Sequence, residues 1–478
     1  MTYKVLLKDG KFDADNQLGT VAAQQNTVKN AIQRAAAENK PLVLHLHGGL
    51  VKRSSGEEIA DRLQADYSAA GGVPLFFVWQ TGLIETIRTN YMEALKGRLI
   101  KWALGRLLRK LAGKLNVPVD QLATRSIDSD TEFSAIELQS FETELMEDAE
   151  FDVIATSLVN AVNAEVGDNV PEPAEFRSLL TTPGLADEET KREAATLDAN
   201  LFVSDDTKGT RGVIDTLSFK WKVIKAIGET LLGVVRRYRN HTEHTTHATI
   251  IEELSRRIHG DYIGAEIWGF MKTDSRQAFN KGNQYAGDFF LKCLEQSNPR
   301  PRVVIVAHSA GAVFTCHLLT AASTGPFDLA FLAPAVTSHL FDKTVTNHGT
   351  KIANFRMFTM HDPLERADAL INSLPKLYPS SLLYLIAGIL ELDEDRQPDI
   401  DKPILGMERF YSTNYRGRKD DHPMLARVRD WLNGKPNQIV WSKSVNGPGL
   451  GTESADHGDF DNDDATVKSL KHIIQNGY

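Results

Sequence analysis

The 478-residue sequence predicts an α/β protein whose open, mostly parallel sheet carries helices on both faces. Two observations support this class. Short runs of consecutive apolar residues recur between turn residues, as expected for strands that are buried on both faces of a parallel sheet. Helix-like segments lie between several of these runs, and such alternation is typical of α/β sheets.

Six apolar runs are expected to form strands. In chain order they are PLVLHLH (residues 41–47), VPLFFVW (73–79), RVVIVAH (302–308), FDLAFLA (327–333), IANFRMFTM (352–360) and NQIVWS (437–442). The expected helices are residues 24–38, 57–69, 284–296, 311–322, 424–432 and 465–475. Each helical segment has apolar residues at helical spacing, so one face of each helix can pack on the sheet.

A long interruption divides the predicted sheet domain. Residues 81–299 have helical periodicity and hardly any strand signal, so we expect a large α-helical cap insertion in a core made of residues 1–80 and 300–478. The insertion leads back into that core, and an assignment of about residues 250–299 to the core itself stays open. A smaller insertion is expected at residues 364–407, which include the apolar segment SSLLYLIAGIL.

Two segments of the large insertion are basic and amphipathic, at residues 95–115 and 219–239. Helices of this kind can lie on an anionic membrane surface, which leaves a weak membrane contact open. They can equally be cap helices that bury their apolar stripe. We favour the second interpretation because the acidic segment 120–152 is available in the same chain to balance their charge.

Composition narrows the class of protein. Hydrophobic residues make up 42% and charged residues 24% of the chain, which is ordinary for a globular protein with a sizeable core. The net charge of -9 argues against nucleic acid as the main partner. Cys293 and Cys316 are expected to be free thiols in a reducing compartment. Without a signal-peptide pattern or an apolar run of about 18 residues, we expect a cytoplasmic protein.

The segment RPRVVIVAHSAGAVFTCHLL places Ser309 between a predicted strand and a predicted helix. A strand followed by x-Ser-x-Gly and a helix is the sequence form of a nucleophile elbow, a tight turn that lifts the serine hydroxyl clear of the sheet. Small residues are needed two positions before and after the serine, and Ala307 and Gly311 supply them. The usual first glycine is replaced here by alanine. Ser309 is therefore the candidate nucleophile.

A nucleophilic serine needs a base, and the base needs an acid that orients it. Asp362 follows the predicted strand 352–360 directly, and His457 lies in a loop rich in glycine and serine after the last predicted strand. The order Ser309, Asp362, His457 predicts a catalytic triad. The side chain of His308 is expected to point away from the hydroxyl. Alternatives that stay open are His361 and His422 for the base, and Glu365 and Asp368 for the acid.

Acyl transfer also needs N–H donors for the developing oxyanion. The sequence VLHLHGGLV follows an early strand, and its glycines let backbone N–H groups face a site. The predicted oxyanion hole consists of the amide of Ala310 and amides from Gly48, Gly49 and Leu50. We expect His45 and His47 to orient this loop by hydrogen bonds. The spacing of His241, His244 and His247 drifts around a helix, so we do not expect them to bind a metal.

These motifs resemble those of the α/β-hydrolase superfamily of serine hydrolases, over about residues 41–79 and 300–478. The resemblance implies an eight-stranded, mostly parallel sheet and a two-step acyl-enzyme mechanism without cofactor or metal. It implies an esterase or lipase acting on a small-molecule or lipid ester. A serine peptidase or amidase of the same fold is the alternative, and an interaction protein on an inactive hydrolase scaffold is a third. The sequence alone does not define the acyl or alcohol group.

Overall fold

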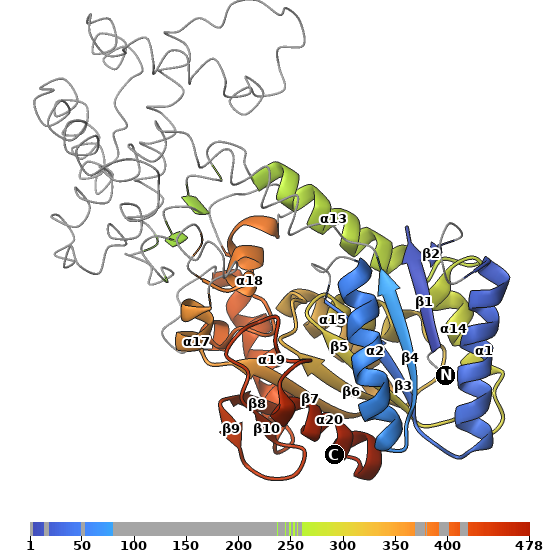
Figure 1. Cartoon of the computed structure of the whole chain (residues 1–478). Helices are drawn as coiled ribbons and strands as arrows, with labels where there is room; N and C mark the ends of the chain where they lie inside the picture. Colours follow the sequence, from blue (N-terminus) through green and yellow to red (C-terminus); the bar gives the residue numbers. More distant parts are fainter. Residues whose placement is uncertain are drawn as a thin grey trace, which may run out of the picture. The chain divides into compact units, whose positions relative to one another are not determined.

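The computed structural model of the chain describes residues 3–13, 19–48, 53–79, 261–368, 380–391, 401–411 and 419–478, together with Tyr378 and a few single positions between 237 and 256. The chain divides into two compact units. One consists of residues 1–89, 262–375 and 379–478, and the other of residues 90–261 and 376–378. The sheet and the helices that cover it belong to the first unit (Figure 1).

The centre of this unit is an eight-stranded sheet with the strand order β2-β1-β4-β3-β5-β6-β7-β8. Neighbouring strands are parallel except β1 and β2, which pair antiparallel at one edge. The strands are β1 (Tyr3–Lys8), β2 (Lys11–Phe12), β3 (Leu42–Leu46), β4 (Val73–Trp79), β5 (Val303–His308), β6 (Phe327–Leu332), β7 (Ile352–Met360) and β8 (Ile439–Ser442). The α/β class, the mostly parallel sheet and the six predicted strands are thereby confirmed. The sequence analysis missed β1 and β2.

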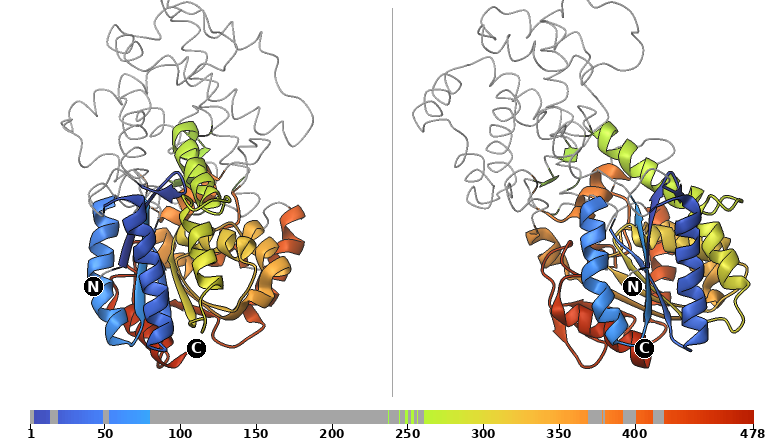
Figure 2. Two further views of the ribbon diagram at one scale, coloured as in Figure 1. Left: turned by 90° about the vertical axis from the view of Figure 1, so that its right-hand side faces the viewer. Right: turned by 45° about the vertical axis from the view of Figure 1, so that its right-hand side comes forward.

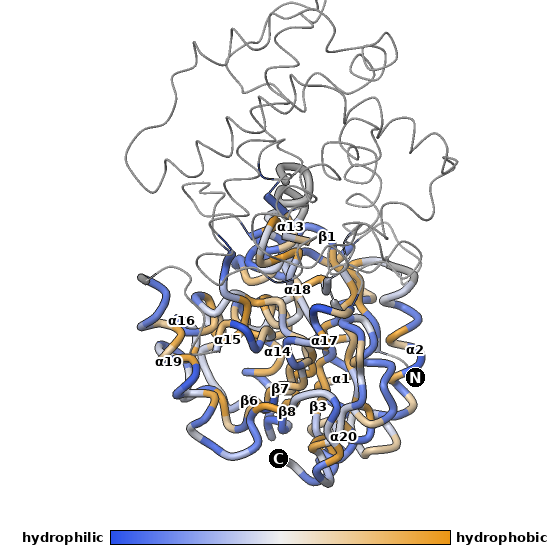
Figure 3. Tube along the Cα trace, turned by 90° about the vertical axis from the view of Figure 1, so that its left-hand side faces the viewer, coloured by the Kyte–Doolittle hydropathy of each residue, from blue (hydrophilic) through white to orange (hydrophobic). Residues whose placement is uncertain are grey.

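Helices cover both faces of the sheet. Helices α1 (Val21–Ala37) and α2 (Arg53–Ala69) lie on opposite sides of it in the right-hand view of Figure 2. Helix α2 packs beside α20 (Asp464–Asn476), whereas α1 packs against α14 (Ala286–Glu295). On the α14 side, α15 (Gly311–Ala321) contacts α16 (Ser338–His348), which contacts α19 (His422–Asn433). Hydrophobic and hydrophilic residues alternate along α2 and α19, as expected for helices with one buried face (Figure 3).

Shorter elements complete the described part of the unit. They are α13 (Asp261–Gln277), α17 (Asp362–Ala367), α18 (Leu382–Leu385), and the antiparallel pair β9 (Ser444–Val445) and β10 (Gly451–Thr452). A π-helical turn at Ile386–Leu390 continues α18. The sequence analysis did not predict α13, α16 or α17.

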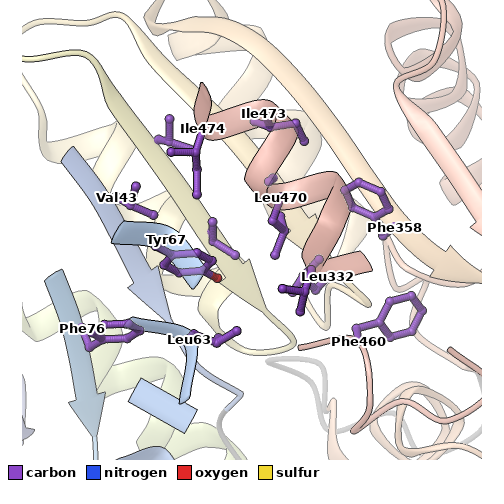
Figure 4. Close-up of a cluster of buried hydrophobic side chains, with 14 of the residues drawn as sticks. Val43, Leu63, Tyr67, Phe76, Leu332, Phe358, Phe460, Leu470, Ile473 and Ile474 are labelled. Carbon is purple, nitrogen blue, oxygen red and sulfur yellow. The ribbon is translucent and has the colours of Figure 1, made fainter. Parts of the chain in front are cut away.

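One face of the sheet packs on α2 and α20 through a continuous apolar cluster (Figure 4). Leu63 and Tyr67 of α2 and Leu470 of α20 meet the strand side chains Val43 and Phe358 there. All five are fully buried. Because burying a large apolar side chain stabilises a fold by about 1.5–3 kcal/mol, this cluster holds α20, and with it the loop before α20, against the sheet.

The opposite face is built around aromatic pairs. Phe77 of β4 contacts the edges of Phe290 on α14 and Phe314 on α15, with ring centroids 5.9 and 6.1 Å apart. Phe331 of β6 meets Phe341 of α16 in the same way at 6.4 Å. Edge-to-face pairs of this kind stabilise a core beyond simple burial. They fix α15, and therefore the turn that precedes it.

Several predicted features lie outside the described residues: the basic segments 95–115 and 219–239 (except Arg237), the acidic segment 120–152, and most of the large insertion. Cys293 and Cys316 are both free thiols. No helix within the described ranges is long and apolar enough to cross a membrane.

Candidate active site

The turn between β5 and α15 forces an unusual backbone conformation on Ser309. Its φ is 51°, in the left-handed region that non-glycine residues seldom enter. The Ser309 N–H donates to the carbonyl of Leu332 on β6 at 2.9 Å, which holds the turn at the sheet edge. A Cβ on Gly311 would lie 2.5 Å from the carbonyl oxygen of Leu46, so strand and helix approach too closely for any side chain there. Such strain at a turn is common at functional sites.

Ser309 meets a histidine from the far end of the chain. Its Oγ lies 3.0 Å from Nε2 of His457, in the loop between β10 and α20. Both residues are buried, with exposed fractions of 2% and 6%. Burial lowers the pKa of His457 well below its ordinary value, and the nearby His308 lowers it further. His457 is therefore neutral near pH 7, and its Nε2 can accept the proton of Ser309.

Two further side chains hold the backbone of His457. Its N–H donates to Oδ2 of Asp368 at 2.8 Å, and its carbonyl lies 2.9 Å from Nε2 of His308. The His308 and His457 rings are 5.5 Å apart. Because the N–H and the carbonyl of His457 are both bonded to buried side chains, its backbone is held in place beside Ser309.

His308 is itself bound to a carboxylate that the sequence analysis did not identify. Its Nδ1 lies 3.4 Å from Oδ2 of Asp461, a buried residue in the loop before α20. Both ring nitrogens of His308 thus face acceptors, and only the doubly protonated imidazolium satisfies both. Burial lowers the pKa of His308, but the hydrogen bond and charge of Asp461 outweigh it and raise the pKa above its ordinary value. Arg62 of α2 donates to the backbone carbonyl of Asp461 and completes the group.

Asp362, the predicted acid, has other partners. It begins α17 directly after β7, and its carboxylate accepts from Tyr384 Oη at 2.5 Å and from Arg366 Nε at 2.6 Å. Nδ1 of His457 is buried and has no hydrogen-bond partner among the described residues. The structure therefore brings Ser309 and His457 together and engages Asp362 elsewhere. The physical reason is local, because Arg366 lies one helical turn beyond Asp362 on the same face of α17.

The alternative acids and bases also have defined positions. Glu365 is buried, and burial raises its pKa well above the ordinary carboxyl value, which favours its protonated form. Burial raises the pKa of Asp368 to about 7, and the neighbouring Asp456 adds to this effect. His361 is exposed and lies 2.9 Å from Glu408. His422 is exposed at the start of α19. Of these four candidates, only Asp368 bonds to His457.

The predicted oxyanion donors lie partly within the described residues. Ala310 is the N-cap residue of α15, where a helix leaves its first N–H groups unpaired. A Cβ on Gly48 would lie 3.4 Å from Cβ of Ser309, so the end of β3 adjoins the serine. Gly49 and Leu50 lie outside the described residues.

The sequence analysis expected His45 and His47 to orient the loop by hydrogen bonds; His47, just after β3, bonds to the start of the loop, whereas His45 of β3 bonds to α2. His47 Nδ1 lies 2.6 Å from the carbonyl oxygen of Gly48, and its Nε2 accepts the Trp79 N–H at 3.1 Å. Burial lowers the pKa of His47 to about 4, so the ring is neutral and can donate at one nitrogen while accepting at the other. Nδ1 of His45 lies 3.0 Å from Tyr67 Oη on α2.

In the second unit, His244 belongs to a buried ionic group. Its Nε2 lies 3.1 Å from Oε1 of Glu252, and Arg237 donates to the other carboxylate oxygen at 2.5 Å. Charges in this group lower the pKa of Glu252 despite its burial. His241 and His247 lie outside the described residues. Among the residues that the structure describes, no group of three or more His, Cys, Asp or Glu side chains is arranged to hold a metal ion.

Comparisons with protein-family models, with curated proteins and with solved structures found no match. Sequence reasoning had singled out the Ser309 and His457 positions, and it had missed Asp461 and the contact of His308 with the His457 loop. The available signal was the cluster of acids around His457, at Asp456, Asp459 and Asp461, none of which the sequence analysis placed in the site.

Proposed function

We propose that this chain is a serine hydrolase of the α/β-hydrolase type that cleaves carboxylic esters through an acyl-enzyme. The observation that carries the proposal is the 3.0 Å contact between Ser309 Oγ, on a strained strand-to-helix turn, and Nε2 of a neutral, buried His457. An adjacent base within hydrogen-bond reach is what turns a weak serine nucleophile into a reactive one.

The reaction follows from these contacts. Ser309 Oγ forms a bond to the ester carbonyl carbon while its proton passes to His457 Nε2. The Ala310 amide, and amides of the loop that begins at Gly48, stabilise the negative charge that develops on the carbonyl oxygen. The tetrahedral intermediate collapses, the alcohol leaves with the proton from His457, and water then releases the acid by the same steps.

Two aspartates, not one, position His457. Asp368 fixes the His457 N–H, and Asp461 acts through His308 on the His457 carbonyl. Asp461 also raises the pKa of His457, which opposes the effect of burial and makes the imidazole a better base. Asp368 and Asp461 are positioning residues, since each acts through His457. Asp362 stabilises the start of α17 through Arg366 and Tyr384.

A panel of p-nitrophenyl esters tested beside aminoacyl p-nitroanilides examines the proposal and its amidase alternative together. We expect turnover of at least one ester, and its loss in Ser309→Ala on the order of a millionfold, as in other triad knockouts. Ser444→Ala is the matched control, because it removes a serine hydroxyl that makes a long hydrogen bond, at 3.4 Å, to the backbone carbonyl of Leu450. Turnover of anilides but not esters would favour the amidase. Equal turnover by wild type and Ser309→Ala would remove Ser309 from the chemistry.

A further inference from the structure

A pocket opens next to Ala310, at the edge of the sheet where β1 and β4 end and α15 begins. Its empty volume is about 430 Å³ including the open space at its mouth. Most of its wall is apolar, as is usual for small-molecule sites. The apolar lining residues are Leu7, Trp79, Met271, Ala310, Val313 and Phe314.

Two carboxylates at this pocket lack a cation among the described residues. Asp9, in the turn after β1, and Asp274, on α13, both line the pocket. Lys272 also lines it, but its Nζ is bonded to Glu391 at 2.5 Å and is committed there. Burial, and then the charge of Asp9, raise the pKa of Asp274 to about 6. Asp274 is therefore largely ionised near pH 7 beside a like charge, and a cation would stabilise it.

The pocket also contains buried polar atoms without partners in the described part of the chain. Ser275 lines the pocket with an exposed fraction of only 8%, and its Oγ has no hydrogen-bond partner. Nε1 of Trp79 is buried and equally unpartnered. Buried polar groups are almost always hydrogen-bonded, so unpaired atoms in a pocket wall point to a ligand that pairs with them.

The faces of Trp79 are already covered. His47 stacks on its ring at 4.8 Å and Phe314 stacks at 5.5 Å. A cation cannot sit over this indole, so the carboxylates must recognise the charge.

We propose that this pocket binds an organic ammonium group with an apolar body, as part of the substrate of Ser309. The ammonium donates to Asp274, Asp9 and Ser275 Oγ, and its apolar part packs on Met271 and Val313. Placing this group in a substrate rests on the proposed hydrolase function, because Ala310 both lines the pocket and follows the nucleophile. Binding of the ammonium itself rests only on the pocket.

Isothermal titration calorimetry of the full-length protein with n-butylammonium and with 1-butanol tests the binding. The two probes share an apolar body and differ in charge, so we expect the ammonium to bind about threefold tighter or more, the scale of a partly exposed ion pair. Asp274→Asn should remove this preference and leave 1-butanol unaffected. Asp430→Asn, an equal charge change at an exposed position on α19, should leave both affinities unchanged.

A second variant keeps the test valid if Asp274→Asn does not fold. Asp9 has a φ of 53°, which asparagine adopts readily, so Asp9→Asn keeps the turn and should also reduce the preference. Equal affinities for the two probes in the wild type, or a preference that survives both variants, would overturn the proposal.

Ester hydrolysis tests whether the ammonium group belongs to a substrate of Ser309. L-leucine methyl ester should be cleaved with a higher kcat/KM than methyl 4-methylpentanoate, which lacks only the amine, and Asp274→Asn should bring the two values together. Equal kcat/KM values in the wild type would overturn the substrate part of the proposal. Ammonium binding without turnover of any ester or anilide would instead contradict the hydrolase function and leave the pocket assignment intact.

Discussion

Strands β5 and β7 run parallel in one sheet, and each ends in a short turn that leads into a helix (Figure 1). After β5, Ser309 has a strained backbone, and its hydroxyl contacts a histidine 148 residues away. After β7, Asp362 begins α17, and its carboxylate is bonded to Arg366 four residues on and to Tyr384 on the nearby α18. One turn thus presents its polar side chain to a distant loop, while the other uses it locally.

At this edge of the sheet, the residue with the strained backbone, Ser309, is the one whose side chain contacts a distant segment. Ser309 has a left-handed φ of 51°, and its Oγ contacts a partner in a distant loop, Nε2 of His457. Asp362 takes an ordinary helical start after the extended His361, where a nearby arginine on the helix can bind its carboxylate. A strand end alone therefore does not make a polar residue part of a site.

Three aspartate-to-asparagine variants test this comparison. Two of them should have the largest effects on ester turnover. Asp368→Asn and Asp461→Asn should each slow ester turnover by about tenfold to hundredfold. The first weakens the acceptor of the His457 N–H, and the second removes the charge that holds His308 beside the His457 carbonyl. Asp362→Asn should change it by less than about threefold. Steady-state kcat measures all three. A larger loss of kcat in Asp362→Asn than in the other two variants would identify Asp362 as the catalytic acid and contradict the contrast drawn here.

Gly311→Ala tests the strain after β5. The added Cβ would lie 2.5 Å from the Leu46 carbonyl oxygen, so we expect the free energy of unfolding in urea to fall by roughly 1–3 kcal/mol. The control is Gly349→Ala, in the turn before β7, where a Cβ meets nothing within 4 Å. Similar stabilities for the two variants would mean that the β5 turn relaxes easily and is not strained by close packing.

The smallest expected effect is on the pH dependence of the free energy of unfolding. His308 has a raised pKa and Asp461 a lowered one, so their interaction is fully present between their ordinary values, 3.8 and 6.5. It is lost as pH rises through the raised pKa of His308, and as pH falls through the lowered pKa of Asp461. The difference in unfolding free energy between wild type and Asp461→Asn should therefore be largest, at about 1 to 2 kcal/mol, near pH 5 to 6 and should shrink above pH 7. A difference that is constant with pH would show that the pair does not form.

The sequence predicted those features that depend on short stretches of chain. The six buried strands, and the serine between Val306 and Gly311, have local signals: consecutive apolar residues, and small residues where strand and helix touch. Strand β1 was missed because Lys4 and Lys8 interrupt the apolar pattern of a short segment near the sheet edge.

The partners of the site depend on contacts between distant segments, which no local pattern encodes. The direction of the Asp362 carboxylate is set by Tyr384, 22 residues away on another helix. The role of His308 depends on Asp461, which comes close only because α20 packs on the sheet through Leu470 and Ile473. A residue can therefore be placed at the right edge by its position in the sequence, while its side-chain partners follow from the packing of other elements.

The most direct test of the central claim, that His457 activates Ser309, is the mass of the intact protein after exposure to a fluorophosphonate at neutral pH. We expect one adduct on wild type, located at Ser309 by peptide mapping, no adduct on Ser309→Ala, and labelling of His457→Ala slowed by several orders of magnitude. His422→Ala, which removes an exposed histidine, should label like wild type. Undiminished labelling of His457→Ala, or an adduct on a serine other than Ser309, would contradict the claim.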